Sequence, residues 1–533
     1  EYRFDPAQEC KLSAGERKSV VFPHAKETRL NLFSLDPAAG SLQLKAGQKT
    51  LDAFGGEFPT RGSLVPDEYV NPDPIPDAVA NVAESQLKDS LNPAAASLLK
   101  RKVPPGLPAQ QDETTIDLAI RVGSQMNGDC LVIQGPPGTG KTYTASHMIA
   151  ALLADGKKIG ITSNGHKAIM NLVKACGRVL SENGRPLLGV RAGDGGDEQF
   201  FKDNPRFLHR KTGGEAYEEY SDGILAGTAW LFSRADWNHE LDYLFVDEAG
   251  QVPLANVVAM TRCTKNLVLL GDQMQLEQPI QGAHPRDARL SALQYALKDV
   301  DNSHEDAAVF HSVVPDDCGI FLGETRRMHP AVCDFISESV YNGRLHSHPD
   351  CAKQAIDISG DHGERNAGYG IVFYGIEHDG NIQDSEEEVE QILEVYKDLL
   401  GRLYTDKDGV TKPLELSDFL FIAPYNAQVR ALERSLPAGA RVGSVDKFQG
   451  QEAPVCMLSL CSSFGEYGSR GIGFILNQNR INVAISRAQC TAVVVADPRI
   501  ASTAPSSIET MKLLNLFCKL LPFNSGKNGG YLD

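Results

Sequence analysis

The most informative segment of this chain is Gly135-Pro136-Pro137-Gly138-Thr139-Gly140-Lys141-Thr142. The apolar run Cys130–Gln134 before it predicts a buried strand. Residues 141–155 after it have helical spacing, and Gly156 is placed to end the helix. Strand, glycine-rich turn and helix are the context that a phosphate-binding loop requires. The alternative, a glycine-rich turn that binds nothing, leaves the complete motif in this context unexplained.

The residue types of this loop suit a nucleoside triphosphate and Mg²⁺. Its glycines let backbone N–H groups surround a phosphate, and the start of the following helix adds partial positive charge. Lys141 can reach the β- and γ-phosphates, and the Thr142 hydroxyl can ligate Mg²⁺. The loop alone predicts triphosphate binding and no particular reaction.

The whole chain bounds the class of protein. At 533 residues it is too long for one core, so we expect three or four domains or subdomains. No apolar run is long enough to span a bilayer, which predicts that no membrane is involved. Its 11 cysteines are scattered without a CxxC pair, which favours free thiols in a reducing, cytoplasmic setting over disulfides or a zinc site. The net charge of −17 argues against a protein that coats nucleic acid generally, but it allows a local basic channel.

The first part of the chain predicts a small β module over residues 1–75. Leucines alternate with polar residues over 30–35 and again over 41–45, with a turn between them, which is typical of a β-hairpin. Residues 76–109 are rich in alanine and leucine and are interrupted at Asn92-Pro93. This segment predicts a pair of stalk helices followed by a linker.

From about residue 110 short apolar strands alternate with helices, which is typical of a parallel α/β sheet. We expect one α/β domain over 110–312 and a second over 313–533. The polar segment 193–222 contains several glycines, and we expect it to be an inserted surface subdomain outside the sheet. The further predicted strands are 158–163, 243–246 and 267–270 in the first domain, and 371–374, 419–423 and 492–496 in the second.

Asp247 and Glu248 follow the apolar residues 244–246. Two adjacent carboxylates at the end of a strand are costly unless a cation or water occupies the site. Asp247 suits Mg²⁺, directly or through water, and Glu248 suits the positioning and deprotonation of an attacking water. An acidic turn before a helix is the alternative, and the phosphate-binding loop nearby disfavours it.

Three further polar residues lie near the ends of predicted elements. Gln275 can sense a γ-phosphate or the lytic water, although in isolation a polar loop explains it equally well. Arg327, in the stretch RRMHP, and Arg487, in the stretch NVAISRA, can each stabilise transition-state charge from a neighbouring domain. Taken singly, either arginine is more often a surface ion-pair partner.

In order, and almost end to end from about residue 110 to 500, these motifs resemble those of superfamily-1 helicases. The closest likeness is to the 5′-to-3′ group that includes the nonsense-mediated-decay RNA helicases, which PYNAQ (424–428) also matches. Within that group the chain is similar to the helicase half of bacterial fusions with a RecB-type nuclease. The segments that carry this likeness are ITSNGHK (161–167), GTAW (227–230) and VGSVDKFQGQE (442–452).

The resemblance implies an α/β fold with two RecA-like P-loop NTPase domains, in which the N-terminal module is a small β-barrel and 193–222 is a second insertion. It also implies that ATP and Mg²⁺ bind between the two RecA-like domains. Lys141, Thr142, Asp247, Glu248, Gln275, Arg327 and Arg487 would then form the hydrolysis site, and Gly450 and Glu452 would contact the ribose and phosphates. The implied contacts with the nucleic-acid backbone are Ser163, Asn164, Thr228, Asn426 and Ser444.

Three departures from the group's pattern affect nucleotide recognition. Arg326 replaces the usual tyrosine before Arg-Met-His-Pro, so adenine would stack on a guanidinium plane or on another residue. Gln489 replaces the second arginine of the last motif. Gln110 and Gln111 are both candidates for the glutamine that reads adenine, because the spacing does not decide between them.

The implied function is that of an ATP-dependent helicase or translocase that moves 5′ to 3′ on single-stranded nucleic acid, with DNA favoured over RNA. We expect a monomeric motor without a nuclease segment of its own, and a nuclease domain or partner upstream stays open. Two alternatives also stay open. One is a nucleic-acid-stimulated ATPase that remodels protein–nucleic-acid complexes without unwinding, and the other is a nucleotide-gated switch or scaffold that hydrolyses slowly.

Overall fold

The computed structural model describes residues 1–5, 12, 14, 19–23, 25, 28–36, 39–67, 71–277, 284–299, 310–358, 368–448, 450–466 and 471–521. Parts of the predicted second domain lie outside these residues, among them residue 449 of the VGSVDKFQGQE motif and residues 522–533. The chain forms two compact units, Glu1–Pro72 and Asp73–Asp533. Among the described helices, none has both the length and the apolar character that crossing a bilayer requires.

The N-terminal unit is an antiparallel sheet with strand order β1-β4-β3-β2-β5. The predicted hairpin is confirmed, since β3 (Leu30–Asp36) pairs with β4 (Ser41–Lys45). Leucines of both strands are buried with Val20 and Phe22 in a small core. The end strands β1 and β5 do not pair with each other in the described residues, so closure into a barrel stays a prediction. The other elements are β1 (Tyr2–Arg3), β2 (Ser19–Val21), β5 (Val65–Pro66) and α1 (Gln48–Ala53).

The predicted helix pair opens the second unit as α2 (Ile75–Leu87) and α3 (Pro93–Lys100). Asn92 caps α3, because its side chain accepts a hydrogen bond from the Ala94 backbone N–H at 2.8 Å. Apolar side chains of both helices are buried in the core of the first α/β sheet. These helices are therefore part of that domain's packing rather than a free stalk.

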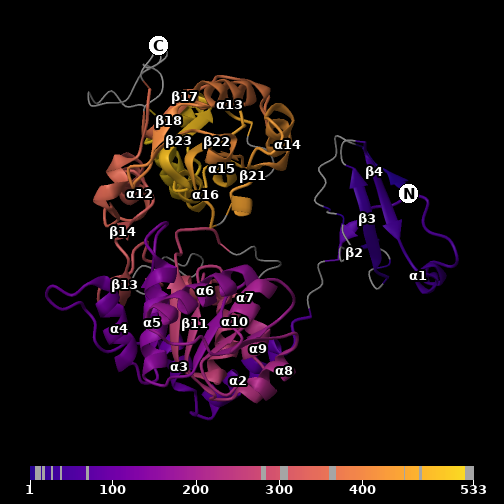
Figure 1. The fold of residues 1–533 in the computed structure, drawn as a ribbon. Coiled ribbons are helices and arrows are strands. Elements are labelled where there is room, and N and C mark those ends of the chain that lie inside the picture. Colours follow the sequence, from indigo (N-terminus) through magenta and orange to yellow (C-terminus); the bar gives the residue numbers. More distant parts are fainter. Residues whose placement is uncertain are drawn as a thin grey trace. The chain divides into compact units, whose positions relative to one another are not determined.

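The first α/β sheet is entirely parallel, with strand order β13-β6-β12-β11-β7-β10-β8-β9. One face is covered by α4 (Thr115–Gln125), α5 (Lys141–Ala154) and α6 (His166–Glu182), and the other by α2, α3 and α10 (Leu254–Met260) (Figure 1). The strands are β6 (Cys130–Gln134), β7 (Ile159–Thr162), β8 (Gly189–Ala192), β9 (Phe207–Arg210), β10 (Ile224–Ala226), β11 (Leu241–Val246), β12 (Thr264–Gly271) and β13 (Gly319–Phe321). The strands predicted within this sheet are thus confirmed.

Two expectations about this domain are wrong. Residues 193–222 are not a subdomain outside the sheet, because they contain β9, which pairs in parallel with β8 as an edge strand. An edge strand buries few of its side chains, and only Phe207 of β9 is fully buried. The sequence of β9 is therefore mostly polar and resembles that of a loop. The expected domain boundary at 312 is too early, since β13 pairs with β6 of the first sheet. The helices of the 193–222 segment are α7 (Glu198–Asp203) and α8 (Gly213–Glu219).

The second α/β sheet is also parallel, with strand order β17-β23-β22-β20-β21. Its strands are β17 (Gly370–Gly375), β20 (Phe419–Ile422), β21 (Val442–Gly443), β22 (Ala453–Ser459) and β23 (Ala488–Ala496), which confirms the three that were predicted. The helices α13 (Glu386–Leu399) and α14 (Asn426–Ser435) cover one face. The other face is covered by α12 (Pro330–Val340), α16 (Gln478–Ile485) and α17 (Ile508–Cys518).

Short elements connect the two sheets and complete the fold. Beside the first sheet lie α9 (Ala229–Phe232) and α11 (Ala292–Ala296), and α15 (Ile472–Ile475) precedes α16. A two-stranded pair joins β14 (Glu324–Thr325) to β15 (His346–Ser347). A small antiparallel sheet contains β16 (Ala355–Ile356), β18 (Leu403–Thr405) and β19 (Thr411–Pro413).

Candidate nucleotide and nucleic-acid sites

The phosphate-binding loop joins β6 to the N-terminus of α5, as predicted. Gly138 and Gly140 have φ angles of +77° and +82°, which other residues rarely adopt. The Lys141 side chain folds back over the loop, and its Nζ donates a hydrogen bond to the Gly135 carbonyl at 2.5 Å. A Cβ on Gly135 would lie 2.2 Å from Lys141 Cγ, so this position needs glycine. The loop is therefore shaped with its lysine beside the backbone that would surround a phosphate.

The two predicted carboxylates lie directly after β11. Asp247 is buried, and the Glu248 backbone N–H donates to its Oδ1 at 2.9 Å. Burial first, and then the neighbouring charge of Glu248, raise the pKa of Asp247 to about 7, although Lys141 acts in the opposite direction. Glu248 adopts a positive φ of +54°, an uncommon backbone conformation for glutamate. A cation beside Asp247 would favour its charged form, so the site is arranged to accept one.

The residues around Asp247 fit Mg²⁺. Thr142 and Asp247 line one cavity and offer a hydroxyl and a carboxylate oxygen, the ligand types that Mg²⁺ prefers. Among the described residues, no cluster of three or more histidine, cysteine or acidic side chains could hold a metal by itself. That is expected for Mg²⁺, which is usually held by one or two protein groups together with waters and substrate phosphates. Thr142 and Asp247 are the residues that would hold it.

One cavity of about 580 Å³ collects residues from both sheets. The first sheet's domain contributes the phosphate-binding loop, both carboxylates and Gln275. The second contributes Arg327, Gly450 and Arg487. Of the residues predicted for the nucleotide site, the cavity lining contains Pro136, Pro137, Gly138, Thr139, Gly140, Lys141, Thr142, Asp247, Glu248, Gln275, Arg327, Gly450 and Arg487.

The two arginines bring positive charge into this cavity. Burial first, and then repulsion from Arg327, lower the pKa of Arg487 to about 10. The Nη1 atom of Arg487 donates to the Gln451 carbonyl at 3.3 Å, while its buried Nε has no partner among the described residues. Arg327 donates to the Ser486 carbonyl at 3.2 Å and forms an ion pair with Glu452. Two close guanidinium groups, one incompletely bonded, create a place for an anion.

The backbone next to Arg327 lies against the phosphate-binding loop. The Thr325 hydroxyl donates to the Pro137 carbonyl, and the Arg326 N–H donates to the Gly138 carbonyl, each at 2.9 Å. A Cβ on Gly138 would lie 2.5 Å from Arg327 Cβ, so glycine is needed for this close approach as well as for its φ. The segment that carries the second domain's arginine is thus attached to the first domain's loop.

Comparison with known proteins agrees with this arrangement. Two family profiles, both described as an AAA domain, match residues 119–305 and 306–499. The DNA polymerase alpha-associated DNA helicase A of Schizosaccharomyces pombe is 25% identical over 69% of this chain and 60% of its own length. The DNA replication ATP-dependent helicase/nuclease dna2 of the same yeast is 22% identical over 72% of this chain and 27% of its own. The chain belongs to the superfamily-1 helicases.

The resemblance to the group of the nonsense-mediated-decay helicases is therefore confirmed, while the narrower likeness to bacterial nuclease fusions stays a prediction. The helicase spans less than two thirds of the length of the two yeast relatives. Among solved structures, the arterivirus nonstructural protein 10 helicase has a TM-score of 0.40 and 13% identity, over 91% of this chain and 76% of that one.

Several residues predicted for nucleotide recognition do not line the cavity of this helicase. Arg326 projects to the surface, where its guanidinium pairs with Glu324 at 3.4 Å. Gln110 and Gln111 are exposed and absent from the lining. The Glu452 carboxylate is bonded to Arg327 and to Gln489, whose Nε2 donates at 2.8 Å, so Glu452 holds an arginine rather than facing the cavity.

Other lining residues were missed from the sequence. Tyr143 and His147, one turn apart on α5, line the cavity with ring centroids 4.1 Å apart. Arg178 and Glu182 of α6 lie on the same lining. Two rings at a spacing of four residues directly after the loop could have been recognised as a helix face beside the phosphates, whereas the contribution of α6 depends on how the helices pack.

The predicted nucleic-acid residues lie at the carboxyl ends of neighbouring strands. In the first sheet, Ser163 and Asn164 follow β7, and Thr228 follows the adjacent β10 as the N-cap of α9. In the second sheet, Asn426 begins α14 after β20, and Ser444 follows the adjacent β21. Each sheet thus presents its predicted contacts along one edge.

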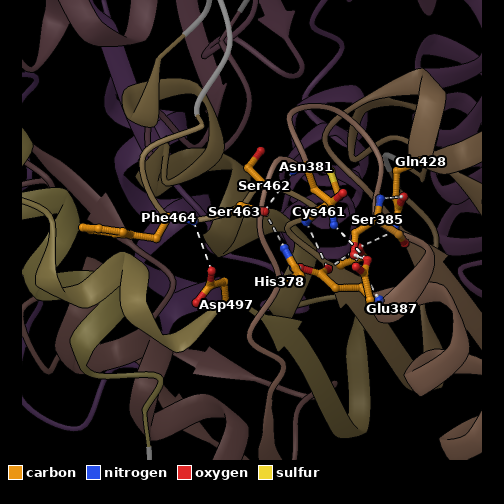
Figure 2. Close-up of polar contacts among 12 residues, drawn as sticks. His378, Asn381, Ser385, Glu387, Gln428, Cys461, Ser462, Ser463, Phe464 and Asp497 are labelled. Atoms are coloured by element: carbon orange, nitrogen blue, oxygen red, sulfur yellow. Dashed lines mark hydrogen bonds and ion pairs between the residues drawn. The ribbon is translucent and has the colours of Figure 1, made fainter.

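A buried polar cluster lies at the same edge of the second sheet and includes Gln428 of the PYNAQ motif (Figure 2). The Gln428 Nε2 donates to the Ser459 hydroxyl at 2.9 Å and to the Ser385 carbonyl at 3.1 Å. The Ser459 hydroxyl in turn donates to Glu388 at 2.5 Å. These bonds fix the first turn of α14, which carries Asn426, against the ends of β22 and α13.

The same cluster, which we call the His378 cluster, contains a serine, a histidine and an acid in series. The two ring nitrogens of His378 lie 2.7 Å from the Ser463 hydroxyl and 3.0 Å from a Glu388 carboxylate oxygen. The residues Ser463, His378 and Glu388 are only 0%, 4% and 0% exposed, so no substrate can reach the hydroxyl. The arrangement is a structural network and not a hydrolase site.

Proposed function

We propose that this helicase couples ATP hydrolysis between its two α/β domains to 5′-to-3′ movement along single-stranded nucleic acid, with DNA favoured over RNA. The observation that carries the proposal is the single cavity in which the phosphate-binding loop and both carboxylates face Arg327 and Arg487 of the other domain. Each domain supplies groups that the other lacks, so complete assembly of the site depends on their relative position.

The chain's own residues account for the steps of hydrolysis. The loop N–H groups and Lys141 bind the β- and γ-phosphates, and Glu248 orients the attacking water and accepts its proton. Held by Thr142 and Asp247, Mg²⁺ would neutralise charge on the phosphate oxygens. Gln275, which lines the same cavity, would hydrogen-bond the γ-phosphate or the lytic water. Arg327 and Arg487 stabilise the charge that develops as the terminal phosphoryl group leaves.

The aromatic pair on α5 supplies a surface for the nucleobase. Tyr143 is 57% exposed and lies on the lining beside the loop, together with His147. A base stacked on these rings takes the place of the contact expected from Arg326, which projects elsewhere. Stacking is tolerant of base identity, so this helicase is expected to discriminate weakly between purine triphosphates.

Preference for DNA over RNA is supported by the names of the two yeast relatives, each described as a DNA helicase or a DNA replication helicase. Backbone contacts by hydroxyl and amide side chains such as Ser163 and Asn426 are sequence-independent, as a translocating motor needs. Such contacts do not require the 2′-OH of RNA.

The test is ATP hydrolysis with and without single-stranded DNA or RNA, followed by strand displacement on duplexes with a 5′ or a 3′ tail. We expect stimulation by DNA, stronger than by RNA, and unwinding only from the 5′ tail. The Glu248→Gln variant should bind ATP without turning it over. Hydrolysis that neither nucleic acid stimulates would contradict the proposal and favour a switch. Stimulation with streptavidin displacement but without unwinding would identify a remodelling translocase.

A further inference from the structure

The loop after β12 contains a buried carboxylate that accepts four hydrogen bonds. Asp272 Oδ1 accepts from the Gln134 side chain at 3.2 Å and from the Met274 backbone N–H at 3.1 Å. Its Oδ2 accepts from Gln275 Nε2 at 2.9 Å and from the Tyr341 hydroxyl at 2.6 Å. Asp272 therefore joins Gln275, which lines the nucleotide cavity, to a residue on the second domain.

Tyr341 extends this hydrogen-bond network into the second domain. It follows α12 as the C-cap and is fully buried. Its hydroxyl donates to Asp272 and accepts from Asn482 Nδ2 at 2.9 Å. Burial first, and then Asp272, raise the pKa of Tyr341 well above its ordinary value, so the hydroxyl keeps the proton that it donates. Asn482 also donates to the Met274 carbonyl at 2.7 Å.

Apolar packing at the same place joins the two domains. Met274 and Leu276 of the loop are buried in the hydrophobic cluster that underlies α12 and α16 of the second sheet. The loop is thus held both by packing and by the bonds to Tyr341 and Asn482. A displacement of Gln275 would move groups that belong to the core of the other domain.

An arginine of the nucleotide cavity flanks each of the two helices that these hydrogen bonds reach. Arg327 lies just before α12, whose 11 residues span about 16 Å, and Tyr341 ends this helix. Arg487 lies just after α16, which contains Asn482. The path from Gln275 through Asp272, Tyr341 and Asn482 therefore connects a γ-phosphate contact of one domain with the arginines of the other.

We propose that Tyr341 is a positioning residue that couples the nucleotide state at Gln275 to the placement of α16 and its arginine, and so to nucleic-acid affinity. The inference deepens the proposed function and rests on it. Gln275 Nε2 carries two protons, so it can bond Asp272 and a γ-phosphate oxygen together. The presence or loss of that phosphate then shifts a network that spans both domains, which is the differential contact that coupling requires.

The test measures coupling rather than activity alone, using the Tyr341→Phe variant of the full chain. The quantity is the factor by which a non-hydrolysable ATP analogue changes the Kd for a fluorescent single-stranded DNA. We expect each ligand to bind the variant nearly normally when alone, while this factor shrinks by about tenfold or reaches one. Because coupling is reciprocal, the effect of DNA on the affinity for the analogue must shrink equally.

Tyr243→Phe is the matched control. It removes a hydroxyl of another buried tyrosine, which donates to the Gly123 carbonyl at 2.8 Å within the first domain. The control therefore also loses one buried hydrogen bond, but that bond does not belong to the path from Gln275 to Asn482. Asn482→Ala interrupts the path from the other side and must reproduce the loss. A normal coupling factor in a folded Tyr341→Phe or Asn482→Ala protein overturns the inference. A wild-type protein without coupling would refute the proposed function instead.

Discussion

The nucleotide cavity and the His378 cluster are both built from buried polar side chains, but these are satisfied to different degrees. In the His378 cluster, His378 is hydrogen-bonded to Glu388, and both Glu388 and Gln428 are hydrogen-bonded to the Ser459 hydroxyl. In the cavity, burial holds the pKa of Asp247 near 7, and the Nε of Arg487 has no partner among the described residues. The nucleotide cavity thus keeps buried charge that only a ligand can neutralise, whereas the polar groups of the His378 cluster satisfy one another.

Lys141→Ala should change activity more than any other substitution, because it should abolish turnover. The lysine is the loop's own cation for the β- and γ-phosphates, so we expect nucleic-acid-stimulated kcat to fall by about a thousandfold or more. Lys157→Ala is the control, because Lys157 is exposed, follows α5 and does not line the cavity. Full turnover by Lys141→Ala in a steady-state ATPase assay would show that the cavity is not the hydrolysis site.

The next largest effect is on the free energy of unfolding and comes from a substitution in the His378 cluster. His378→Ala removes the partner of one oxygen of the buried Glu388 carboxylate, while the other oxygen keeps its bonds from Ser459 and Cys461. We therefore expect the free energy of unfolding to fall by about 2 kcal/mol. Urea titrations of both proteins measure it. Nucleotide affinity should be unchanged, because His378 does not line the cavity. An unchanged midpoint would mean that the cluster contributes nothing to the fold.

This stabilisation should depend on pH in a defined direction. Burial lowers the pKa of His378, but the hydrogen bond to Glu388 and the nearby charges of Glu388 and Asp497 outweigh it and raise the pKa above the ordinary 6.5. The folded protein therefore binds the proton more tightly than the unfolded chain. The advantage of wild type over His378→Gln should be complete below pH 6.5 and shrink as the pH rises through the folded pKa. If the stability difference between wild type and His378→Gln instead grows towards alkaline pH, the pKa of His378 is lowered in the folded protein and not raised.

In the nucleotide cavity, removing a buried charged group should stabilise the folded protein, whereas His378→Ala should destabilise it. At pH 8 without Mg²⁺ or nucleotide, Asp247→Asn removes a buried charge, and we expect the unfolding free energy to rise by about 1 to 2 kcal/mol. Thermal melts compare the two proteins. Adding Mg²⁺ and ATP should stabilise the wild type more than the variant, because only the carboxylate holds the cation well. Destabilisation by Asp247→Asn would remove the contrast between the two regions.

The smallest effect concerns the base. Tyr143→Ala removes a stacking surface, worth about 1 to 3 kcal/mol per base, at the edge of the cavity. We expect KM for ATP to rise by about fivefold to tenfold, with kcat nearly unchanged, while Tyr143→Phe behaves as wild type. An equal rise in Arg326→Ala, measured side by side, would assign the base to the guanidinium instead.

The sequence predicted those parts of the site that depend on neighbours along the chain. The loop at 135–142 and the pair Asp247–Glu248 each combine a strand end with the residues that act there, so local pattern and chemistry agree. The six further strands were found for the same reason. The expectations that failed depended on packing between distant segments. Thus β9 is recognisable as a strand only once β8 lies beside it. Likewise, only the folded structure shows that the Arg326 side chain is exposed and pairs with Glu324.

Tyr341 shows the limit most clearly. In the sequence it follows an apolar helix and looks like an ordinary core residue. Its hydroxyl acquires a role only because Asp272 and Asn482, both far from it in the chain, approach within 2.6 Å and 2.9 Å. No local sequence pattern predicts hydrogen bonds between residues so far apart in the chain. The contribution of α6 to the cavity lining could not be predicted for the same reason.

If the two domains complete one hydrolysis site, single-turnover hydrolysis should depend on Arg487, and the Arg487→Ala variant shows whether it does. ATP binding and hydrolysis are measured in parallel at saturating single-stranded DNA. We predict binding within about threefold of wild type and a hydrolysis rate lower by about a thousandfold, as for the loss of an arginine that contacts the transition state. Hydrolysis at the wild-type rate with Arg487 removed would show that the second domain's arginine takes no part in the hydrolysis site.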